Sequence, residues 1–288
     1  MNGEAARLDG VVVYDKPAGM TSSAAVGAVR RSLGGRGVKA GHAGTLDPFA
    51  TGLLLILVGR ATRVQRFLMA LPKRYQATAR FGATSTTGDP EGEIAETGVV
   101  PEGDLELPTG RLRQRPPAFS AVKVAGRRAY ALARAGDTAL VLPEREIEVY
   151  RFEETWRDGD RRGFEIECSS GTYVRSLIAD LGDAYCEQLR RTGIGPFDVS
   201  AADPDLVISL PTALDFLPEV RVDPDQARRA GHGLSVPADP PAAPGSVVRI
   251  TGEKGLIALA ELRAGGQEFK PVVGFSPPVG FSPPVGDR

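Results

Sequence analysis

The sequence predicts an α+β fold organised as two domains. Its 288 residues are about twice the length of a typical domain. Strand-like and helix-like segments follow one another without the regular strand–helix–strand alternation of a parallel α/β sheet. Glycine (35 residues) and proline (23 residues) are abundant, which indicates many turns and short strands rather than a helical bundle.

The first third of the chain carries the clearest element patterns. Residues 10–15 (GVVVYD) predict a buried strand that the following Lys-Pro-Ala-Gly turn ends. Thr21 and Ser22 are suited to cap a helix that runs to about Leu33. Beyond a glycine-rich loop, three more elements are expected: an apolar strand at 53–58, an amphipathic helix at 61–71 and an alternating strand at 75–81.

The middle of the chain alternates between surface and regular segments. Residues 88–110 are acidic and predict a surface excursion. Four elements are expected after it: a helix at 127–135, strands at 147–152 and 164–168, and a helix from about 173 to 189. Residues 8–215 are therefore predicted to form the first and larger domain.

A change in composition near residue 220 predicts a second, small and mostly β domain over 220–272. Strands are expected within it at 247–251 and 256–262. The sequence VGFSPP then occurs twice in tandem, beginning at Val273 and at Val279. Because a repeat of this composition offers little to bury, residues 273–288 are predicted to be a disordered tail.

Composition also narrows the kind of chemistry. The longest apolar run, 53–58, is far shorter than the ~18 residues that span a bilayer, and no signal peptide is readable, so a cytoplasmic location is expected. Cys168, Cys186, His42 and His232 have no zinc-ligand spacing. Since nucleotide-binding glycine motifs are also missing from the sequence, we expect chemistry without a cofactor.

The net charge is only −1, but basic and acidic residues are strongly segregated along the sequence. Residues 16–88 hold eleven basic side chains and a single acid, Asp47. Residues 89–110 hold seven acids and no base, and 111–135 hold seven bases and no acid. Solvated surface faces would explain one such block. Two basic blocks favour a phosphate-rich partner, most often nucleic acid.

Asp47 is the sharpest candidate for chemistry. It lies in the loop GHAGTLDPFATG before an apolar strand. An isolated Asp-Pro pair commonly forms a structural turn. A lone acid among cations, however, is expected to stay ionised because nearby arginine lowers its pKa, and a carboxylate can act as nucleophile or base. Glycosidases normally need two carboxylates, whereas a reaction that breaks a glycosidic bond and keeps the base in its pocket tolerates one.

Six motifs follow one another along roughly residues 10 to 200. They are DKPAGMTS (15–22), GHAGTLDPFATG (41–52), KRYQATARFG (73–82), RPPAFSAVKVAGRRAYALAR (115–134), SGTYVRSLIADLG (170–182) and LRRTGIGPF (189–197). In this order they resemble the TruB family of bacterial tRNA pseudouridine synthases, and six ordered motifs leave little room for accident. The resemblance implies a catalytic domain with a mixed, mainly antiparallel sheet, followed by a small β-rich PUA-like domain that binds RNA.

The resemblance also implies an activity. The expected reaction is isomerisation of the T-loop uridine at position 55 of tRNA to pseudouridine, with no metal or organic cofactor. The expected partner is the T arm of tRNA, with no membrane and no obligatory protein partner, and the chain is expected to be a monomer. Asp47 falls on the family's catalytic aspartate, and two pathways stay open, nucleophilic addition and glycal formation.

Three more residues match the family's active site. Tyr75 falls on the tyrosine that stacks on the flipped base and is a candidate to take the C5 proton, although a pKa near 10 makes it a poor base unless the site lowers it. Without the motif, an aromatic on an alternating strand would be a core residue. Arg175 falls on the arginine that pairs with the aspartate. Asp89 matches an acid that holds this arginine.

Three further residues are expected to meet the substrate. His42 matches a residue that stacks in the space left by the extruded base. Lys16 is interpreted as structural or as substrate-positioning. Arg63 belongs to the basic block expected to grip phosphates, which position RNA without specifying its sequence. Phe119 departs from the family, which more often has tyrosine there, so one hydroxyl contact is missing.

Three alternatives differ in class from this interpretation. The first is a non-catalytic RNA-binding protein or RNA chaperone on the same fold, which would not need Asp47, Tyr75 and Arg175 together. The second is a guide-RNA-dependent relative, which the compact N-terminus and the lack of long extensions disfavour. The third is a cofactor-free hydrolase, which lacks its second carboxylate.

Overall fold

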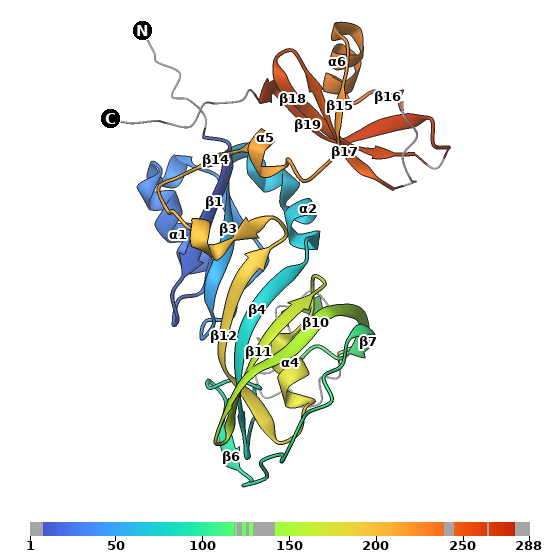
Figure 1. The fold of residues 1–288 in the computed structure, drawn as a ribbon. Helices are drawn as coiled ribbons and strands as arrows, with labels where there is room; N and C mark the ends of the chain where they lie inside the picture. The colour runs from blue at the N-terminus through green and yellow to red at the C-terminus, as the bar shows by residue number, and fades with distance from the viewer. Residues whose placement is uncertain are drawn as a thin grey trace.

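The computed structural model of the chain describes residues 8–117, 119, 123–124, 127–128, 142–238, 245–263 and 265–279. Two main sheets organise these residues. In Figure 1 the second sheet, coloured orange to red, lies at one end of the first, beyond α2 and α5. None of the helices in this described part of the chain is long and apolar enough to cross a membrane.

The larger sheet is mixed and mainly antiparallel, as the resemblance implies. Only the contact between its third and fourth strands is parallel among the described pairs, and short strands β2 (Ala40–Ala43) and β13 (Phe197–Asp198) add to β3 and β12. The strand order is β14 (Ile208–Ser209), β1 (Gly10–Lys16), β3 (Thr51–Val58), β12 (Ala184–Ile194), β4 (Lys73–Phe81), β11 (Arg161–Cys168), β10 (Arg145–Asp158) and β7 (Gly110–Gln114).

Strand β3 is apolar along its length because both of its faces are covered. Leu54 and Ile56 pack against helix α1 (Ser22–Ser32), and Leu53 and Leu55 belong to a second cluster on the other face. The side chain of Thr21 accepts a hydrogen bond from the backbone of the first turn of α1, which confirms the expected cap. The sheet thus holds the two ends of the Asp47 loop in a rigid frame.

Strand β4 confirms the predicted alternation and positions one face of the site. Tyr75, Ala77 and Phe81 are buried, whereas Gln76 is exposed on the opposite face. The buried face packs on helix α4 (Val174–Ala179) within one cluster. A strand with one covered face reads as alternating apolar and polar residues.

The second sheet shares a core with the first. Its order is β15 (Glu219–Arg221), β17 (Val247–Gly252), β18 (Gly255–Leu262), β19 (Glu268–Val279) and β16 (Val236–Pro237), with α6 (Pro224–Gly231) packed on it. Leu259 and Phe275 of this sheet lie in the same apolar cluster as Leu57 and Leu68 of the larger unit. The strands expected at 247–251 and 256–262 are confirmed, while the proposed boundary between two domains stays a prediction.

The remaining elements are short and lie outside the two main sheets. They are η1 (Gly35–Gly37), β5 (Ala83–Ser85), β6 (Ile94–Glu96), β8 (Lys123–Val124), β9 (Arg127–Arg128), η3 (Val199–Ala201) and α5 (Leu210–Ala213). Strands β5 and β6 pair with each other, as do β8 and β9. Residues 90–106 are mostly exposed, so the predicted acidic surface excursion is confirmed.

Two expected helices are wrong in extent. The segment 61–71 divides into the 3₁₀ helix η2 (Gly59–Val64) and the α-helix α2 (Gln65–Ala70). The segment 173–189 holds α4 and then β12. Gly182, with φ +135°, lies between them in a conformation that a helix cannot continue through, and the chain then pairs with β4. In the helix expected at 127–135, the first two residues form strand β9 instead. Residues 129–135 lie outside the described part of the chain.

The predicted disordered tail is wrong for its first part. Residues 273–279 belong to β19, which pairs with β18. Val273 and Phe275 are 8% and 1% exposed, because their alternate spacing points both side chains at the apolar cluster shared by the two sheets. Residues 280–288 lie outside the described part of the chain.

Candidate active site

The loop between β2 and β3 presents Asp47 to the base of a pocket. Ser22, at the start of α1, pins this loop: its hydroxyl accepts from Leu46 N at 2.9 Å and donates to Leu46 O at 3.0 Å. Ala50 N donates to Asp47 O at 3.2 Å, which is the turn that an Asp-Pro pair favours. The Asp47 side chain itself is 33% exposed. The structural and the chemical interpretations of Asp47 therefore hold together, because its backbone forms the turn and its carboxylate stays accessible.

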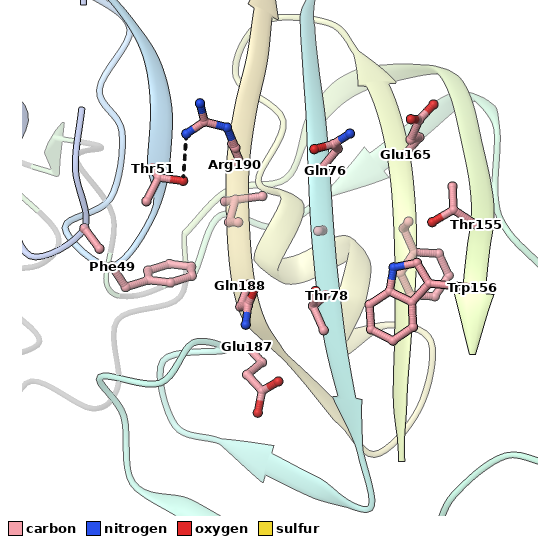
Figure 2. Close-up of a pocket in the computed structure, with 14 residues that line it drawn as sticks. Phe49, Thr51, Gln76, Thr78, Thr155, Trp156, Glu165, Glu187, Gln188 and Arg190 are labelled. Carbon is pink, nitrogen blue, oxygen red and sulfur yellow. Dashed lines mark hydrogen bonds between the residues drawn. The ribbon is translucent and has the colours of Figure 1, made fainter. Parts of the chain in front are cut away.

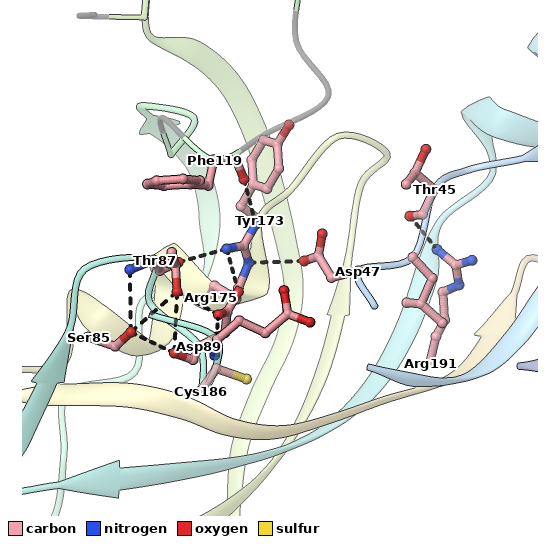
Figure 3. Close-up of polar contacts among 12 residues, drawn as sticks. Thr45, Asp47, Ser85, Thr87, Asp89, Phe119, Tyr173, Arg175, Cys186 and Arg191 are labelled. Atoms are coloured by element: carbon pink, nitrogen blue, oxygen red, sulfur yellow. Dashed lines mark hydrogen bonds and ion pairs between the residues drawn. The ribbon is translucent and has the colours of Figure 1, made fainter. Parts of the chain in front are cut away.

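Arg175 lies between two carboxylates. Its Nε is 2.9 Å from Oδ2 of Asp47, and its Nη1 is 2.7 Å from Oδ2 of Asp89. The arginine comes from the first turn of α4 and its side chain is only 4% exposed. Figure 3 shows the guanidinium with Asp47 on one side and Asp89 on the other. The structure therefore brings together the three residues that the resemblance implies.

The arginine is held from several directions. Its Nη1 also donates to Thr87 O at 2.7 Å, and its Nη2 donates to Phe119 O at 2.9 Å. Asp89 Oδ1 accepts from the Thr87 hydroxyl at 2.6 Å and from Glu91 N at 3.0 Å. Phe119 takes part through its carbonyl, so the hydroxyl missing from its side chain does not alter this contact. A guanidinium fixed in this way presents Nε to Asp47 in one orientation.

Burial raises the pKa of Asp47 above its usual value. The Arg175 guanidinium opposes this shift, the Asp89 charge adds to it, and Arg191 also lowers the pKa. The expectation that surrounding cations hold the pKa below its usual value is wrong. The loss of water around this partly enclosed carboxylate outweighs the opposing effects of Arg175 and Arg191 on its pKa.

Tyr75 is a wall of the pocket whose hydroxyl keeps its proton. The residue is 9% exposed. Burial raises its pKa above 10, with Arg191 opposing the shift. A phenol with a raised pKa is protonated at neutral pH and is a poor base, so the expected role in taking the C5 proton is disfavoured. The position of its ring in the pocket wall is compatible with the expected stacking on the substrate base.

The pocket that contains these groups has a volume of ≈ 490 Å³. Asp47, Tyr75 and Arg175 line it, and Asp89 supports it from behind, buried behind Arg175. Its other walls come from α2, the start of β10 and the segment that leads into α4, and they include Lys73, Arg145, Ser169, Tyr173 and Arg191. A concave pocket with convergent charged groups is the usual form of a catalytic site.

Arg191 is a functional residue that sequence reasoning missed. It is 2% exposed and donates to three backbone carbonyls, from Nε to Leu53 O at 2.7 Å, from Nη2 to Gly44 O at 3.0 Å and from Nη1 to Thr45 O at 3.4 Å. It therefore clamps both ends of the Asp47 loop to β12, and Figure 3 shows its contact with Thr45. The sixth motif contains the pair Arg190–Arg191, but only the strand shows which of the two arginines is buried.

Lys16 does not reach the pocket, so its predicted contact with substrate is wrong. The residue is 0% exposed, and its Nζ donates to Pro17 O at 2.9 Å, Met20 O at 2.8 Å and Pro48 O at 3.2 Å. The structural interpretation holds, because the ammonium joins the DKPAGMTS turn to the residue after Asp47. Burial lowers the pKa of Lys16 to about 8.

His42 and Arg63 lie away from the pocket walls. His42 is in β2, where it pairs with Ile56, and its carbonyl accepts from Gln65 Nε2 at 2.7 Å. Arg63 is in η2, and its guanidinium carbon lies 5.8 Å from the centre of the Phe275 ring. Neither residue is among the residues that line the pocket. Their predicted roles toward RNA stay predictions.

A larger cavity of ≈ 680 Å³ lies on the opposite face of the sheet (Figure 2). Gln76 and Thr78 form its floor, and the half-exposed ring of Trp156 forms one wall. The indole lies over Gly163, where an added Cβ would come within 1.9 Å of its Nε1. None of the seven site residues expected from the sequence lines this cavity in the described structure, so size alone does not identify the site.

Comparisons with known proteins agree with this geometry. Residues 30–174 match the family described as TruB family pseudouridylate synthase (N terminal domain). The chain is 41% identical to the tRNA pseudouridine synthase B of Thermobifida fusca (strain YX), over 93% of this chain and 98% of that protein. It is 43% identical to the enzyme of the same name from Mycobacterium tuberculosis (strain ATCC 25618 / H37Rv), over 80% of this chain and 84% of that one.

Solved structures show the same fold. A chain in the crystal structure of a Cbf5-Nop10-Gar1 complex superimposes with a TM-score of 0.68 and 26% identity, covering 93% of this chain and 84% of that chain. A chain in the structure of an H/ACA RNP bound to a substrate RNA containing 2'-deoxyuridine gives a TM-score of 0.66 with 23% identity, and covers 93% and 86%. With motifs, fold and pocket in agreement, the chain belongs to the TruB family of pseudouridylate synthases.

Proposed function

We propose that this pocket isomerises uridine to pseudouridine in tRNA, and that its target is the T-loop uridine at position 55. One observation carries the proposal from the structure: the Asp47 carboxylate, one-third exposed at the pocket, stands 2.9 Å from a guanidinium that Asp89 holds from behind. Relatives that match nearly the whole chain carry the name tRNA pseudouridine synthase B, which supports tRNA as the substrate.

The reaction conserves the atoms of uridine and needs no hydrolytic water. The C1′–N1 glycosidic bond breaks, the uracil turns while it stays enclosed, and a C1′–C5 bond forms. C5 then gives up its proton and N1 takes up a proton. A single carboxylate beside the sugar is sufficient for this balance, whereas hydrolysis by the usual route needs a second carboxylate to activate water.

Each residue of the site has a role in this proposal. Asp47 acts at the sugar, either by bonding to it or by assisting the breaking of the glycosidic bond. Arg175 orients Asp47 and favours its ionised form, opposing the effect of burial on its pKa. Tyr75 supplies a flat, apolar wall for the uracil ring, with its hydroxyl protonated. Asp89 and Arg191 are positioning residues, because each acts through a neighbour.

The target base must leave its stack to enter the pocket, which costs a few kcal/mol. The basic side chains of 16–88 and 111–135 would recover part of this cost through phosphate contacts. Action as a single cytoplasmic chain, without a partner protein, belongs to this proposal and rests on the resemblance alone.

Tritium release tests the proposal. A tRNA transcript carrying tritium at C5 of uridine is incubated with the wild type, with Asp47→Asn and with Asp225→Asn, a control acid on α6 whose side chain is 80% exposed. We expect release by the wild type and the control, mapped to position 55, and none by Asp47→Asn, which should still bind tRNA. Release by Asp47→Asn would overturn its role. Tight binding without release by the wild type would favour the non-catalytic RNA-binding alternative.

A further inference from the structure

Arg145 brings to the catalytic pocket a positive charge that has no carboxylate partner among the described residues. It is the first residue of β10, and it lines the pocket together with Tyr173 and Gly171. Its guanidinium carbon lies 4.7 Å from the centre of the Tyr173 ring. Gly171, which has φ +86°, lies beside the guanidinium, since a Cβ added to it would be in ordinary contact at 3.5 Å from Nη1 of Arg145. The cation is therefore accommodated against an aromatic face.

The backbone that carries this aromatic ring is held by Gln114. Tyr173 N donates to Oε1 of Gln114 at 2.8 Å, and Gln114 Nε2 donates to Tyr173 O at 3.0 Å. Gln114 is 4% exposed and stands directly opposite Arg145 in the pairing of β7 with β10. The strand pair thus carries both the arginine and the side chain that holds its platform. A guanidinium stacked in this way loses little further freedom when it binds a ligand.

Arg145 differs from the other arginines of the pocket in its partners. Arg175 contacts two carboxylates, Arg191 three carbonyls, and Arg66 forms an ion pair with Glu261 at 2.8 Å. For Arg145, by contrast, no carboxylate within ion-pair distance is found among the described residues. Within that same part of the structure its buried Nε has no hydrogen-bond partner. A planar cation with free donors is suited to a phosphate group.

We propose that Arg145 binds a backbone phosphate that flanks the extruded uridine. The inference rests on the proposed function and specifies how the pocket holds its substrate. The uracil is neutral and turns during the reaction, so it offers only weak binding contacts. The phosphodiester next to it is charged and stays in place. Arg145, stacked on Tyr173, would hold that phosphate at the pocket wall. This contact orients the nucleotide and carries no sequence information.

Salt-dependent binding separates this role from a structural one. The affinity for tRNA is measured against salt concentration for the wild type, Arg145→Gln, Arg145→Lys and Arg151→Gln. Arg151 is a matched control on the same strand, half exposed and already paired with Glu153 at 2.5 Å and Glu165 at 3.1 Å. We expect Arg145→Gln to reduce the slope of log K against log salt by about one. Arg145→Lys should keep the slope, and Arg151→Gln should leave it unchanged.

The same variants are compared in tritium release. We expect KM for tRNA to rise about tenfold in Arg145→Gln, with a much smaller change in kcat, because a phosphate contact made before and during the reaction contributes uniform binding. A T-arm hairpin with one methylphosphonate beside the target uridine tests the contact without altering the protein. Wild type should lose affinity for one such hairpin, and Arg145→Gln should show no further loss on that hairpin.

Distinct results would overturn the inference. An unchanged salt slope in Arg145→Gln, or equal sensitivity of wild type and Arg145→Gln to every flanking methylphosphonate, would exclude the phosphate contact. A fall in kcat with KM and slope unchanged would do the same. These outcomes are separate from failure of the proposed function, in which the wild type itself would bind tRNA and release no tritium.

Discussion

Asp47 and Asp89 share one guanidinium, with Arg175 Nε 2.9 Å from the first carboxylate and Nη1 2.7 Å from the second. The two acids differ in exposure, 33% for the Asp47 side chain and 5% for that of Asp89. The buried acid fixes the arginine, and the arginine in turn orients the accessible acid. This division gives each carboxylate a separate task.

Removing the charge of Asp89 should shift the pH dependence of the reaction. Asp89 raises the pKa of Asp47, while Arg175 lowers it. In Asp89→Asn the first effect is lost, so the pKa of Asp47 should fall and the acidic limb of kcat/KM should move to lower pH. We also expect kcat to fall, because Arg175 loses its anchor. The measurement is a pH–rate profile of tritium release, with Asp104→Asn as an exposed control from the same acidic segment. An acidic limb that moves to higher pH would contradict the coupling.

Replacing Arg191 by lysine should misplace the Asp47 loop. Lysine keeps the charge but cannot donate from three nitrogen atoms to Leu53, Gly44 and Thr45. A displacement of about 1 Å can cost ~10²-fold in rate, so we expect kcat to fall on that order while the Kd for tRNA changes little. Arg190→Lys is the matched control, since Arg190 is half exposed and pairs with Asp15. Equal kcat values for Arg191→Lys and the wild type would show that the clamp is dispensable.

Lys16 should make the stability of the protein depend on pH in the alkaline range. Its pKa is lowered to about 8, against 10.5 for an ordinary lysine. Between these values the unfolded chain binds the additional proton, so this group's contribution to the free energy of unfolding rises with pH. From pH 8 to pH 9.5 the gain is about 1.5 kcal/mol.

Guanidinium unfolding at these two pH values tests this effect, with Lys16→Met beside the wild type. The difference in unfolding free energy between the two proteins should widen at pH 9.5 in favour of the wild type. Lys254→Met serves as the control, because Lys254 is exposed in the turn between β17 and β18. A difference that stays constant with pH would place the pKa of Lys16 at its ordinary value.

Phe275 should stabilise the contact between the two sheets. It is 1% exposed and belongs to the cluster that contains Leu57 and Leu68. Phe275→Ala removes a buried ring, and we expect a loss of about 3 kcal/mol in unfolding free energy. Val272→Ala, on an exposed neighbour (38%) in the same strand, should change stability by less than ~0.5 kcal/mol. Chemical unfolding of both variants checks this, and equal stability would restore the idea of a disordered repeat.

The sequence by itself determined the elements whose signals are local. Thr21 caps α1, the apolar run of β3 reports a strand covered on both faces, and β4 alternates because one of its faces is open. The ordered motifs also placed Asp47, Arg175 and Asp89 together, since a motif records a spatial relationship that spacing alone does not show.

Only the tertiary structure decided what depends on distant neighbours. The sequence predicts a helix for residues 184–189, but β3 and β4 offer this segment a place between them in the sheet, and it forms the first part of β12. The sequence also predicts that Phe275 lies in a disordered tail, but an apolar cluster that includes residues of the other sheet buries it. The pKa of Asp47 rises rather than falls because burial is set by residues far along the chain. Burial and charge proximity are properties of three-dimensional packing, so their balance at a residue cannot be read from its sequence neighbours.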